Sequence, residues 1–437
     1  MAGGNLRIGN GSAGLRYAAI LVGIICVAGV MPARAAEIEY GIDLGAEYTN
    51  NIGLTRDNKQ ADWIGRAAVS ASLKEESRYW SADVSGLVNY EHYFRDTFSD
   101  AVLPSLSSAI AWNILPKRFV WHIDDYYQQI QRNATDPQTP ANRENTNVFW
   151  TGPDLFIPIT PIDRFVVAGR YGDVYYSKSD ADNRRNEFDL RLVHDLSPVS
   201  NVSLNGERLH VNYDRNAFTD YSLYNGYLRY ERKTDLSEFH VLGGSTRVTR
   251  EGQRDLNKYL AGVFWQRALV RDASVGIQIL HHYTDSGVQL LQAAAAPVEP
   301  DLSTAAVSGD LLYEKLYEVF MTLKPGLWTV TGRLNRYQDN YEVSDLDRVA
   351  NGGSLDLSYA WSPTFRVDVR SGYRHIDYTK LNRLDREYGA GIGLNQRITA
   401  RFNLALSYDW RRRKSDLASA EFTENRVFLG LSYRNRL

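Results

Sequence analysis

The stretch Phe402-Asn403-Leu404-Ala405-Leu406-Ser407-Tyr408-Asp409-Trp410 decides the fold, because apolar and small or polar side chains alternate along it without a break. Successive side chains of a β-strand point to opposite faces, so one face of this segment is apolar and ends in aromatic residues. The region Ser362–Leu437 contains four such segments in a row. This pattern is typical of a transmembrane β-barrel, whose strands face lipid on one side and a polar interior on the other.

Residues 1–35 are predicted to be a secretory signal peptide. Two arginines precede the apolar run Tyr17–Val30, and Ala33-Arg34-Ala35 fits the small-residue pattern of a cleavage site. The run is too short and wrongly flanked for a spanning helix, and Cys26 lies inside it, which argues against a lipoprotein. We therefore expect export through the Sec pathway, with residues 36–437 forming the outer-membrane barrel.

The composition is compatible with an exported barrel. Removing residues 1–35 removes the one cysteine and three of the 50 basic residues, which leaves 47 bases against 52 acids and a net charge near −5. An acidic balance does not favour nucleic acid as a partner. The mean hydropathy of −0.39 does not exclude a membrane protein, because barrel strands are half polar.

Short turns and longer polar connections alternate along the chain. Turn-forming residues recur mostly every 36 to 45 residues or so, at 74–77, 116–118, 160–163, 197–200, 233–235, 270–272, 324–326, 362–363 and 397–400. Longer polar segments are found between them, at 49–60, 131–145, 178–185, 214–220, 285–301, 339–348, 378–385 and 412–421. In outer-membrane barrels the short turns face the periplasm and the long loops face outside.

Two strands per period predict an all-β, antiparallel, up-and-down barrel of about 20 strands, with a range of 18 to 22 and a first strand at Ile38–Tyr48. A repeat near 40 residues also fits a propeller blade. A blade holds four short strands, however, whereas each period here holds two strands of about 12 residues, long enough to cross a bilayer. The longest connection, Asp285–Asp301, is the candidate for a loop that folds into the pore.

No constellation for catalysis stands out, so we predict no enzyme, no cofactor and no metal site. The eight histidines are scattered, and the adjacent His281 and His282 point to opposite faces of a strand, so they cannot share a metal. Asp339, Asp345 and Asp347 lack the spacing of an EF-hand loop. We interpret these three acids as part of a solvated acidic loop.

The polar face of the carboxyl-terminal strands predicts the lining of the lumen. This face contains the candidate lumen residues Arg366, Asp368, Arg370, Arg374, Glu387, Asp409 and Arg411. Such residues solvate a water-filled pore, and arginines with carboxylates and aromatics also suit anions or sugar hydroxyls. The aromatics on the apolar face, such as Tyr373 and Trp410, fit the girdles at the membrane interfaces instead.

Short motifs near both ends resemble a known family. Tyr48-Thr49-Asn50-Asn51-Ile52, with Ala61-Asp62-Trp63-Ile64, resembles the first hairpin of the putative β-barrel porin 2 family, and Tyr408–Tyr433 resembles its final hairpin. Members of that family are outer-membrane barrels of Gram-negative bacteria. Several are similar to barrels associated with exopolysaccharide synthesis and export. The resemblance therefore implies an outer-membrane barrel and, as one option, a role in polysaccharide secretion.

Three functional hypotheses follow. The first is a porin-like channel that serves exopolysaccharide secretion, and the second is a selective or general small-solute porin with no link to polysaccharide. The third is a non-conducting structural barrel or an outer-membrane enzyme, for which no nucleophile can be named. The expected partners are outer-membrane lipids and lipopolysaccharide, the barrel-insertion machinery and, under the first hypothesis, polysaccharide-export proteins.

Overall fold

The computed structural model describes residues 36–215, 220–270, 272–285, 287–289 and 310–436. These residues form one antiparallel sheet of 20 strands that closes on itself. The predicted signal peptide 1–35 and most of the segment Asp285–Asp301 lie outside the described residues. Within the described ranges, no helix is both long and apolar enough to cross a membrane.

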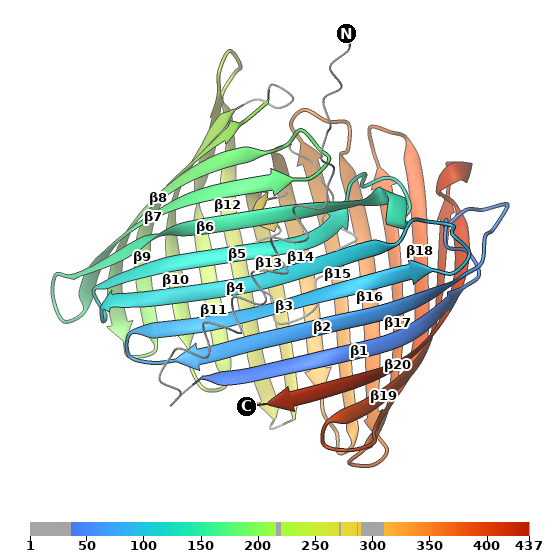
Figure 1. Ribbon diagram of the computed structural model, residues 1–437. Helices are drawn as coiled ribbons and strands as arrows, with labels where there is room; N and C mark the ends of the chain where they lie inside the picture. The colour runs from blue at the N-terminus through green and yellow to red at the C-terminus, as the bar shows by residue number, and fades with distance from the viewer. Residues whose placement is uncertain (1–35, 216–219, 271, 286, 290–309, 437) are drawn as a thin grey trace, which may run out of the picture.

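The described strands follow one another around the wall in chain order (Figure 1). The elements are β1 (Glu37–Thr49), β2 (Asp62–Glu76), β3 (Trp80–Tyr93), β4 (Ala101–Leu115), β5 (Phe119–Gln131), η1 (Pro140–Asn142), β6 (Arg143–Pro158), β7 (Asp163–Tyr176), β8 (Asn183–Ser197), β9 (Ser200–Tyr213), β10 (Tyr221–Lys233), β11 (Ser237–Arg250), β12 (Leu256–Val270), β13 (Ala273–Thr284), β14 (Leu312–Leu323), β15 (Trp328–Tyr341), β16 (Arg348–Ala360), β17 (Phe365–Tyr378), β18 (Arg383–Arg397), β19 (Phe402–Ser415), η2 (Ala418–Ala420) and β20 (Phe422–Arg436). The predicted count of about 20 strands is confirmed, and the propeller is excluded.

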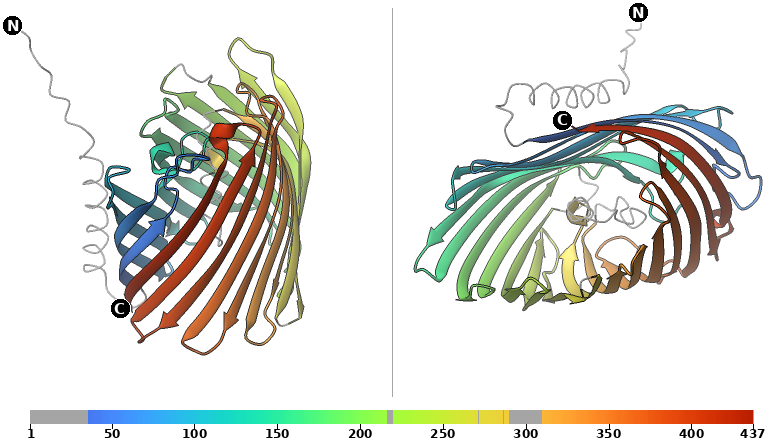
Figure 2. Two further views of the ribbon diagram at one scale, coloured as in Figure 1. Left: turned by 90° about the vertical axis from the view of Figure 1, so that its right-hand side faces the viewer. Right: turned by 90° about the horizontal axis from the view of Figure 1, so that it is seen from below.

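Closure is made by the first and last strands. β1 pairs antiparallel with β20 from Glu39 opposite Arg436 to Thr49 opposite Arg426, and β1 also pairs with β2. Figure 2 shows the resulting oval wall in the view from below, with β1 and β20 side by side. Because each described strand pairs with a neighbour on both sides, the described sheet has no edge strand, as a lipid environment requires.

The alternation of side chains decides which face each residue occupies. In β19, Leu404, Leu406 and Tyr408 are exposed on the outer surface, whereas Ser407 and Asp409 lie on the other face and are partly covered. Cross-strand aromatic pairs mark the periplasmic border of the outer face. These pairs include Trp80 with Trp112, Trp328 with Tyr359, and Phe402 with Tyr433. Tyrosine and tryptophan are enriched at membrane interfaces because their rings are amphipathic.

The two ends of the barrel differ. Short turns connect β2 to β3, β4 to β5 and every second pair thereafter, and the same end holds the start of β1 and the end of β20. The opposite end has the longer connections, among them 50–61, 132–142 and the segment after Thr284. By the usual arrangement of outer-membrane barrels, the short turns face the periplasm and the longer loops face outside.

The alternation predicts opposite effects for the same substitution at neighbouring positions. Leu406→Arg places a charge on the apolar outer face and should lower the free energy of unfolding by about 2–4 kcal/mol, the cost of arginine near the bilayer centre. Ser407→Arg places the same charge on the polar inner face and should cost much less. Denaturant titration of both variants in lipid vesicles measures the difference. Equal destabilisation by the two substitutions would contradict the assignment of faces.

Candidate functional site

The candidate lumen residues lie on one face of β17, β18 and β19, and the structure joins them in ion pairs. Arg374 donates to Glu387 on the neighbouring strand through Nε at 2.8 Å and Nη2 at 2.5 Å. Arg366 Nε lies 3.2 Å from Asp368 Oδ2 on its own strand. Hydrogen bonds between a guanidinium group and a carboxylate are stronger than hydrogen bonds between neutral groups.

Arg370 and Asp409 reach each other across an intervening strand. Arg370 on β17 donates to Asp409 Oδ1 on β19 through Nε at 2.9 Å and Nη2 at 2.6 Å. Gly391 on β18 lies beneath this pair, and a Cβ atom there would lie 2.4 Å from Asp409 Oδ1. The glycine at 391 therefore leaves room for the side chains of both neighbouring strands to cross over β18.

The remaining candidate, Arg411, begins a continuous row of charges that we call the arginine stripe. In spatial order the stripe comprises Arg411, Glu424, Arg426, Glu47, Arg66, Glu91 and Arg143, contributed by β19, β20, β1, β2, β3 and β6. Its shortest contacts are Arg411 Nη2–Glu424 Oε2 at 2.5 Å and Arg143 Nη1–Glu91 Oε2 at 2.9 Å. The sequence reading named only Arg411. Glu424, Arg426, Glu47, Arg66 and Glu91 lie on the inward side of their own strands, so extending the alternation to β20, β1, β2 and β3 finds them. Arg143 lies at the start of β6 on the face opposite to Glu144 and Asp154, so the alternation does not find it.

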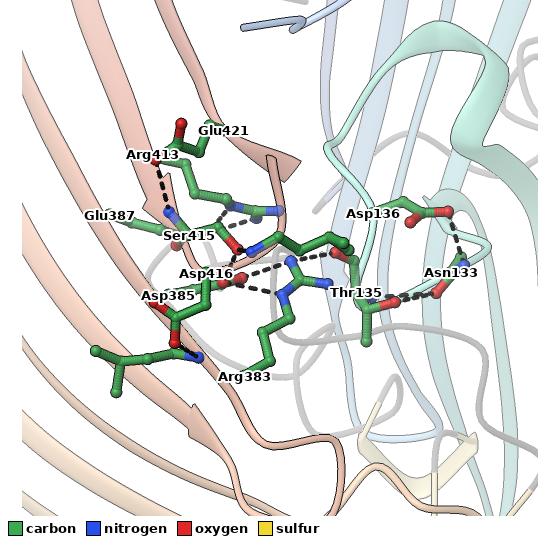
Figure 3. Close-up of polar contacts among 12 residues, drawn as sticks. Asn133, Thr135, Asp136, Arg383, Asp385, Glu387, Arg413, Ser415, Asp416 and Glu421 are labelled. Atoms are coloured by element: carbon green, nitrogen blue, oxygen red, sulfur yellow. Dashed lines mark hydrogen bonds and ion pairs between the residues drawn. The ribbon is translucent and has the colours of Figure 1, made fainter. Parts of the chain in front are cut away.

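A loop from the far side of the mouth joins this wall at its tip. Arg383 on β18 is held by two contacts to Asp385, at 2.9 and 2.7 Å, and Ser415 donates to Asp385 at 2.5 Å. Arg383 Nη2 also donates to the backbone carbonyl of Thr135 at 2.8 Å (Figure 3). Thr135 belongs to the β5–β6 loop 132–142, and six strands of the wall separate β5 from β18: β4, β3, β2, β1, β20 and β19. The loop therefore extends across the mouth of the lumen.

The loop 132–142 is held together by its own hydrogen bonds. Asn133 Oδ1 accepts from the amide and the hydroxyl of Thr135, at 3.1 and 2.9 Å. Asn142 Nδ2 donates to the carbonyls of Asn133 and Pro137, and Gln131 Nε2 donates to the Asn133 carbonyl at 2.8 Å. These contacts fix the conformation of the loop before it meets the opposite wall. Together with the contact to Arg383 they give the barrel a built constriction on its outer side.

A second connection also turns inward. Asp285, which follows β13, is buried and receives Arg185 Nη1 at 2.9 Å and the Tyr221 hydroxyl at 2.5 Å. It also accepts the backbone amides of Gly287 and Val288, at 2.8 and 3.2 Å. Burial opposes the negative charge, but the Arg185 guanidinium and these hydrogen bonds hold the pKa of Asp285 below its usual range. Asp285–Asp301 was the predicted inward loop, and its first described residues are anchored to β8 and β10 inside the barrel.

Two sequence interpretations are corrected here. Arg185 was placed at the end of a polar connection, but it lies in β8 with a side chain only 1% exposed. Asp339 was assigned to a solvated acidic loop, but it lies in β15, is 1% exposed and pairs with Arg348 at 2.7 Å. In both cases the strand extends further toward the outer end of the barrel than the polar sequence indicates. The charged side chain can be buried there because an oppositely charged residue on another segment pairs with it, Asp285 for Arg185 and Arg348 for Asp339.

The adjacent histidines lie on opposite faces, as predicted. His282 lies inward, 3.3 Å from Glu314 Oε1, whereas the His281 ring contacts the Tyr259 hydroxyl at 2.8 Å on the outer side. Across the part of the chain that the structure describes, no group of three or more histidine, cysteine or acidic side chains is arranged to hold a metal ion.

Comparison with known proteins supports the fold. Residues 348–435 match the family model described as Putative beta-barrel porin 2. The predicted resemblance is confirmed for the final hairpin, and the first hairpin lies outside the matched residues. The matched segment spans β16 to β20 and includes all seven candidate lumen residues. The protein is an outer-membrane β-barrel of the porin-like kind, located in the bacterial outer membrane.

Three solved outer-membrane proteins are similar to the chain at low identity. A ferric enterobactin receptor variant from Pseudomonas aeruginosa is 8% identical with a TM-score of 0.50, over 93% of this chain and 81% of that one. The siderophore receptor PirA from the same organism is 10% identical with a TM-score of 0.46, over 91% of this chain and 80% of that one. The FrpB iron transporter of Neisseria meningitidis, in its apoprotein form, is 9% identical with a TM-score of 0.49, over 91% of this chain and 81% of that one. No curated protein matches the chain in sequence.

Removing the cross-lumen contact should loosen the loop. A hydrogen bond to a charged group contributes about 1.5–3 kcal/mol, so Arg383→Ala should speed amide hydrogen exchange in residues 132–142 by roughly tenfold to a hundredfold, since about 1.4 kcal/mol corresponds to a factor of ten. Arg386→Ala is the matched control, because Arg386 is exposed on the outer face of the same strand. If amide exchange in residues 132–142 is equally slow in both variants, the hydrogen bond from Arg383 to Thr135 does not hold the loop in place.

The hydrogen bonds that Asp285 accepts from Gly287 and Val288 should persist as the pH is lowered. A carboxyl group whose folded-state pKa is depressed stabilises the fold above its unfolded pKa, near 3.9, and loses that contribution only as the pH falls through the lower folded value. Protection of the Gly287 and Val288 amides, corrected for intrinsic exchange, should therefore persist from pH 7 to about pH 4. Asp285→Asn should lose it at every pH, whereas Asp345→Asn at an exposed loop position should not. Protection that fades already between pH 6 and 5 would contradict the anchor.

Proposed function

We propose that the protein forms a water-filled channel through which exopolysaccharide crosses the outer membrane. The observation that carries the channel is the inner face of the wall, which presents ion-paired arginines and carboxylates from β17 around to β3 and β6. A closed wall with a polar inside and an apolar outside is the arrangement that passes hydrophilic solutes. The polysaccharide cargo is supported by the family resemblance, since some members accompany exopolysaccharide export.

The contact between loop 132–142 and Arg383 favours a second candidate function, a porin for small solutes. A polymer that is secreted needs a continuous path, whereas loop 132–142 extends across the mouth to Arg383. A fixed constriction of this kind suits solutes of one or a few sugar units. The two candidates therefore differ in whether the loop moves aside when cargo passes.

Conductance and secretion separate these candidates. Purified protein in planar lipid bilayers should give discrete conductance steps under either candidate, and a silent barrel would contradict both. Deleting the gene in its host should abolish surface polysaccharide and leave uptake of small solutes unchanged if exopolysaccharide is the cargo. Unchanged polysaccharide together with slower uptake would support the small-solute porin instead.

A further inference from the structure

The arginine stripe exposes its positive groups and covers its negative ones. The carboxylate side chains of Glu424, Glu91 and Glu47 are 3%, 4% and 7% exposed, whereas the four arginine side chains are each about 30% exposed. The carboxylates lie against the wall, and the guanidinium groups cover them on the lumen side. A solute in the lumen therefore meets cations first, although the row is nearly neutral in sum.

The neighbouring charges leave an excess of arginine. The stripe holds four arginines and three glutamates, and beside it Arg374 and Arg413 share the single carboxylate of Glu387. Six arginines thus face four glutamates, which leaves a net charge of +2. In the described residues, the Nε atoms of Arg66 and Arg426 and the Nη1 atom of Arg413 have no hydrogen-bond partner. These three atoms are buried, so the donors that a solute can reach are the exposed parts of the guanidinium groups.

An aromatic ring lies within the stripe. Phe428 is on the inward face of β20, opposite Glu47 on β1. Its ring covers Gly45 and Gly430, where a Cβ atom on either glycine would come within 2.6 Å of it. The ring therefore lies close against the backbone of β1 and β20, beside the stripe residues Glu47 and Arg426. An aromatic face carries partial negative charge and attracts the C–H groups of a sugar ring.

The opposite wall carries a group of carboxylates. β8 and β9 lie half-way around the 20-strand wall from β18 and β19, and Asp189 stands directly opposite Glu207 in that pair of strands. Glu187 lies on the same face, two residues along β8. Arg170 on β7 is directly opposite Glu187, and Arg191 follows Asp189 on the same face, so this wall mixes both signs. Its carboxylates Glu187 and Asp189 are partly exposed, whereas the carboxylates of the stripe are covered, and this difference sets the stripe apart.

We infer that the arginine stripe is a binding track for carboxylated sugars, in which exposed guanidinium groups donate hydrogen bonds to the sugar carboxylates and the Phe428 ring packs against a sugar ring face. Planar guanidinium groups bind carboxylates through two parallel hydrogen bonds, which an ammonium group cannot reproduce. This inference rests on the proposed channel and names its cargo as acidic saccharide. Neutral sugars of the same size lack the carboxylates and gain only the contact with the ring.

The experiment uses the full-length barrel in planar bilayers with two probes of equal length, trigalacturonate and maltotriose. Trigalacturonate should block the current at a concentration at least tenfold lower than maltotriose does. Arg411→Gln with Arg426→Gln should weaken that block at least tenfold, and Arg426→Lys should weaken it while the charge is kept. Arg333→Gln is the matched control, because Arg333 also lies in the lumen, on β15, and pairs with Glu318.

The results separate the channel from the binding of carboxylated sugars by the stripe. Equal block by both probes in the unmodified protein overturns the carboxylate track and leaves the channel intact, and this result depends on no substitution. An equal loss in the control and stripe variants also overturns it. A barrel without conductance counts against the channel. In that case, calorimetric titration of the detergent-solubilised protein with trigalacturonate still tests the stripe, and absence of binding there overturns it.

Discussion

The pairing of β1 with β20 is the interaction on which the rest of the structure depends. In hydrocarbon there is no water to satisfy a free N–H or C=O, so an open sheet of this length would leave two costly edges. Closure satisfies both edges at once and fixes the register from Glu39 with Arg436 to Thr49 with Arg426. The register in turn decides which side chains face inward, since a shift by one residue exchanges the two faces of a strand. The stripe, the loop contact and the aromatic borders all follow from that choice.

The inner face shows how a wide barrel accommodates many charges. Arginines on one strand reach carboxylates on the next strand or the one beyond, and glycine positions such as Gly391 leave room for them to cross. Each carboxylate of the arginine stripe is bound before any solute arrives, so removing one partner would leave its counterpart partly buried and unpaired. The covered carboxylates and exposed guanidinium groups make a positive surface from a nearly balanced sequence. Net charge alone would not reveal this.

The sequence predicted the barrel, the strand count and the faces of β17 to β20, because strict alternation is a local property that survives in a single chain. It did not predict that Arg185 and Asp339 continue into strands, because their partners Asp285 and Arg348 become neighbours only after folding. The contact between Arg383 and Thr135 joins residues 248 positions apart, and no local pattern indicates it. Glu47, Arg66 and Arg426 were within reach of the alternation, but their shared row appears only once β1 and β20 are adjacent.

The central claim is that one face of each strand lines an aqueous lumen and the other faces lipid. The sequence has one cysteine, Cys26, so single cysteines introduced along β19 of the chain without residues 1–35 report their own surroundings. A charged, membrane-impermeant thiol reagent applied to barrels in lipid vesicles should label Ala405→Cys and Ser407→Cys, and leave Leu404→Cys and Leu406→Cys unlabelled. Labelling on the leucine positions, or on neither set, would contradict the claim.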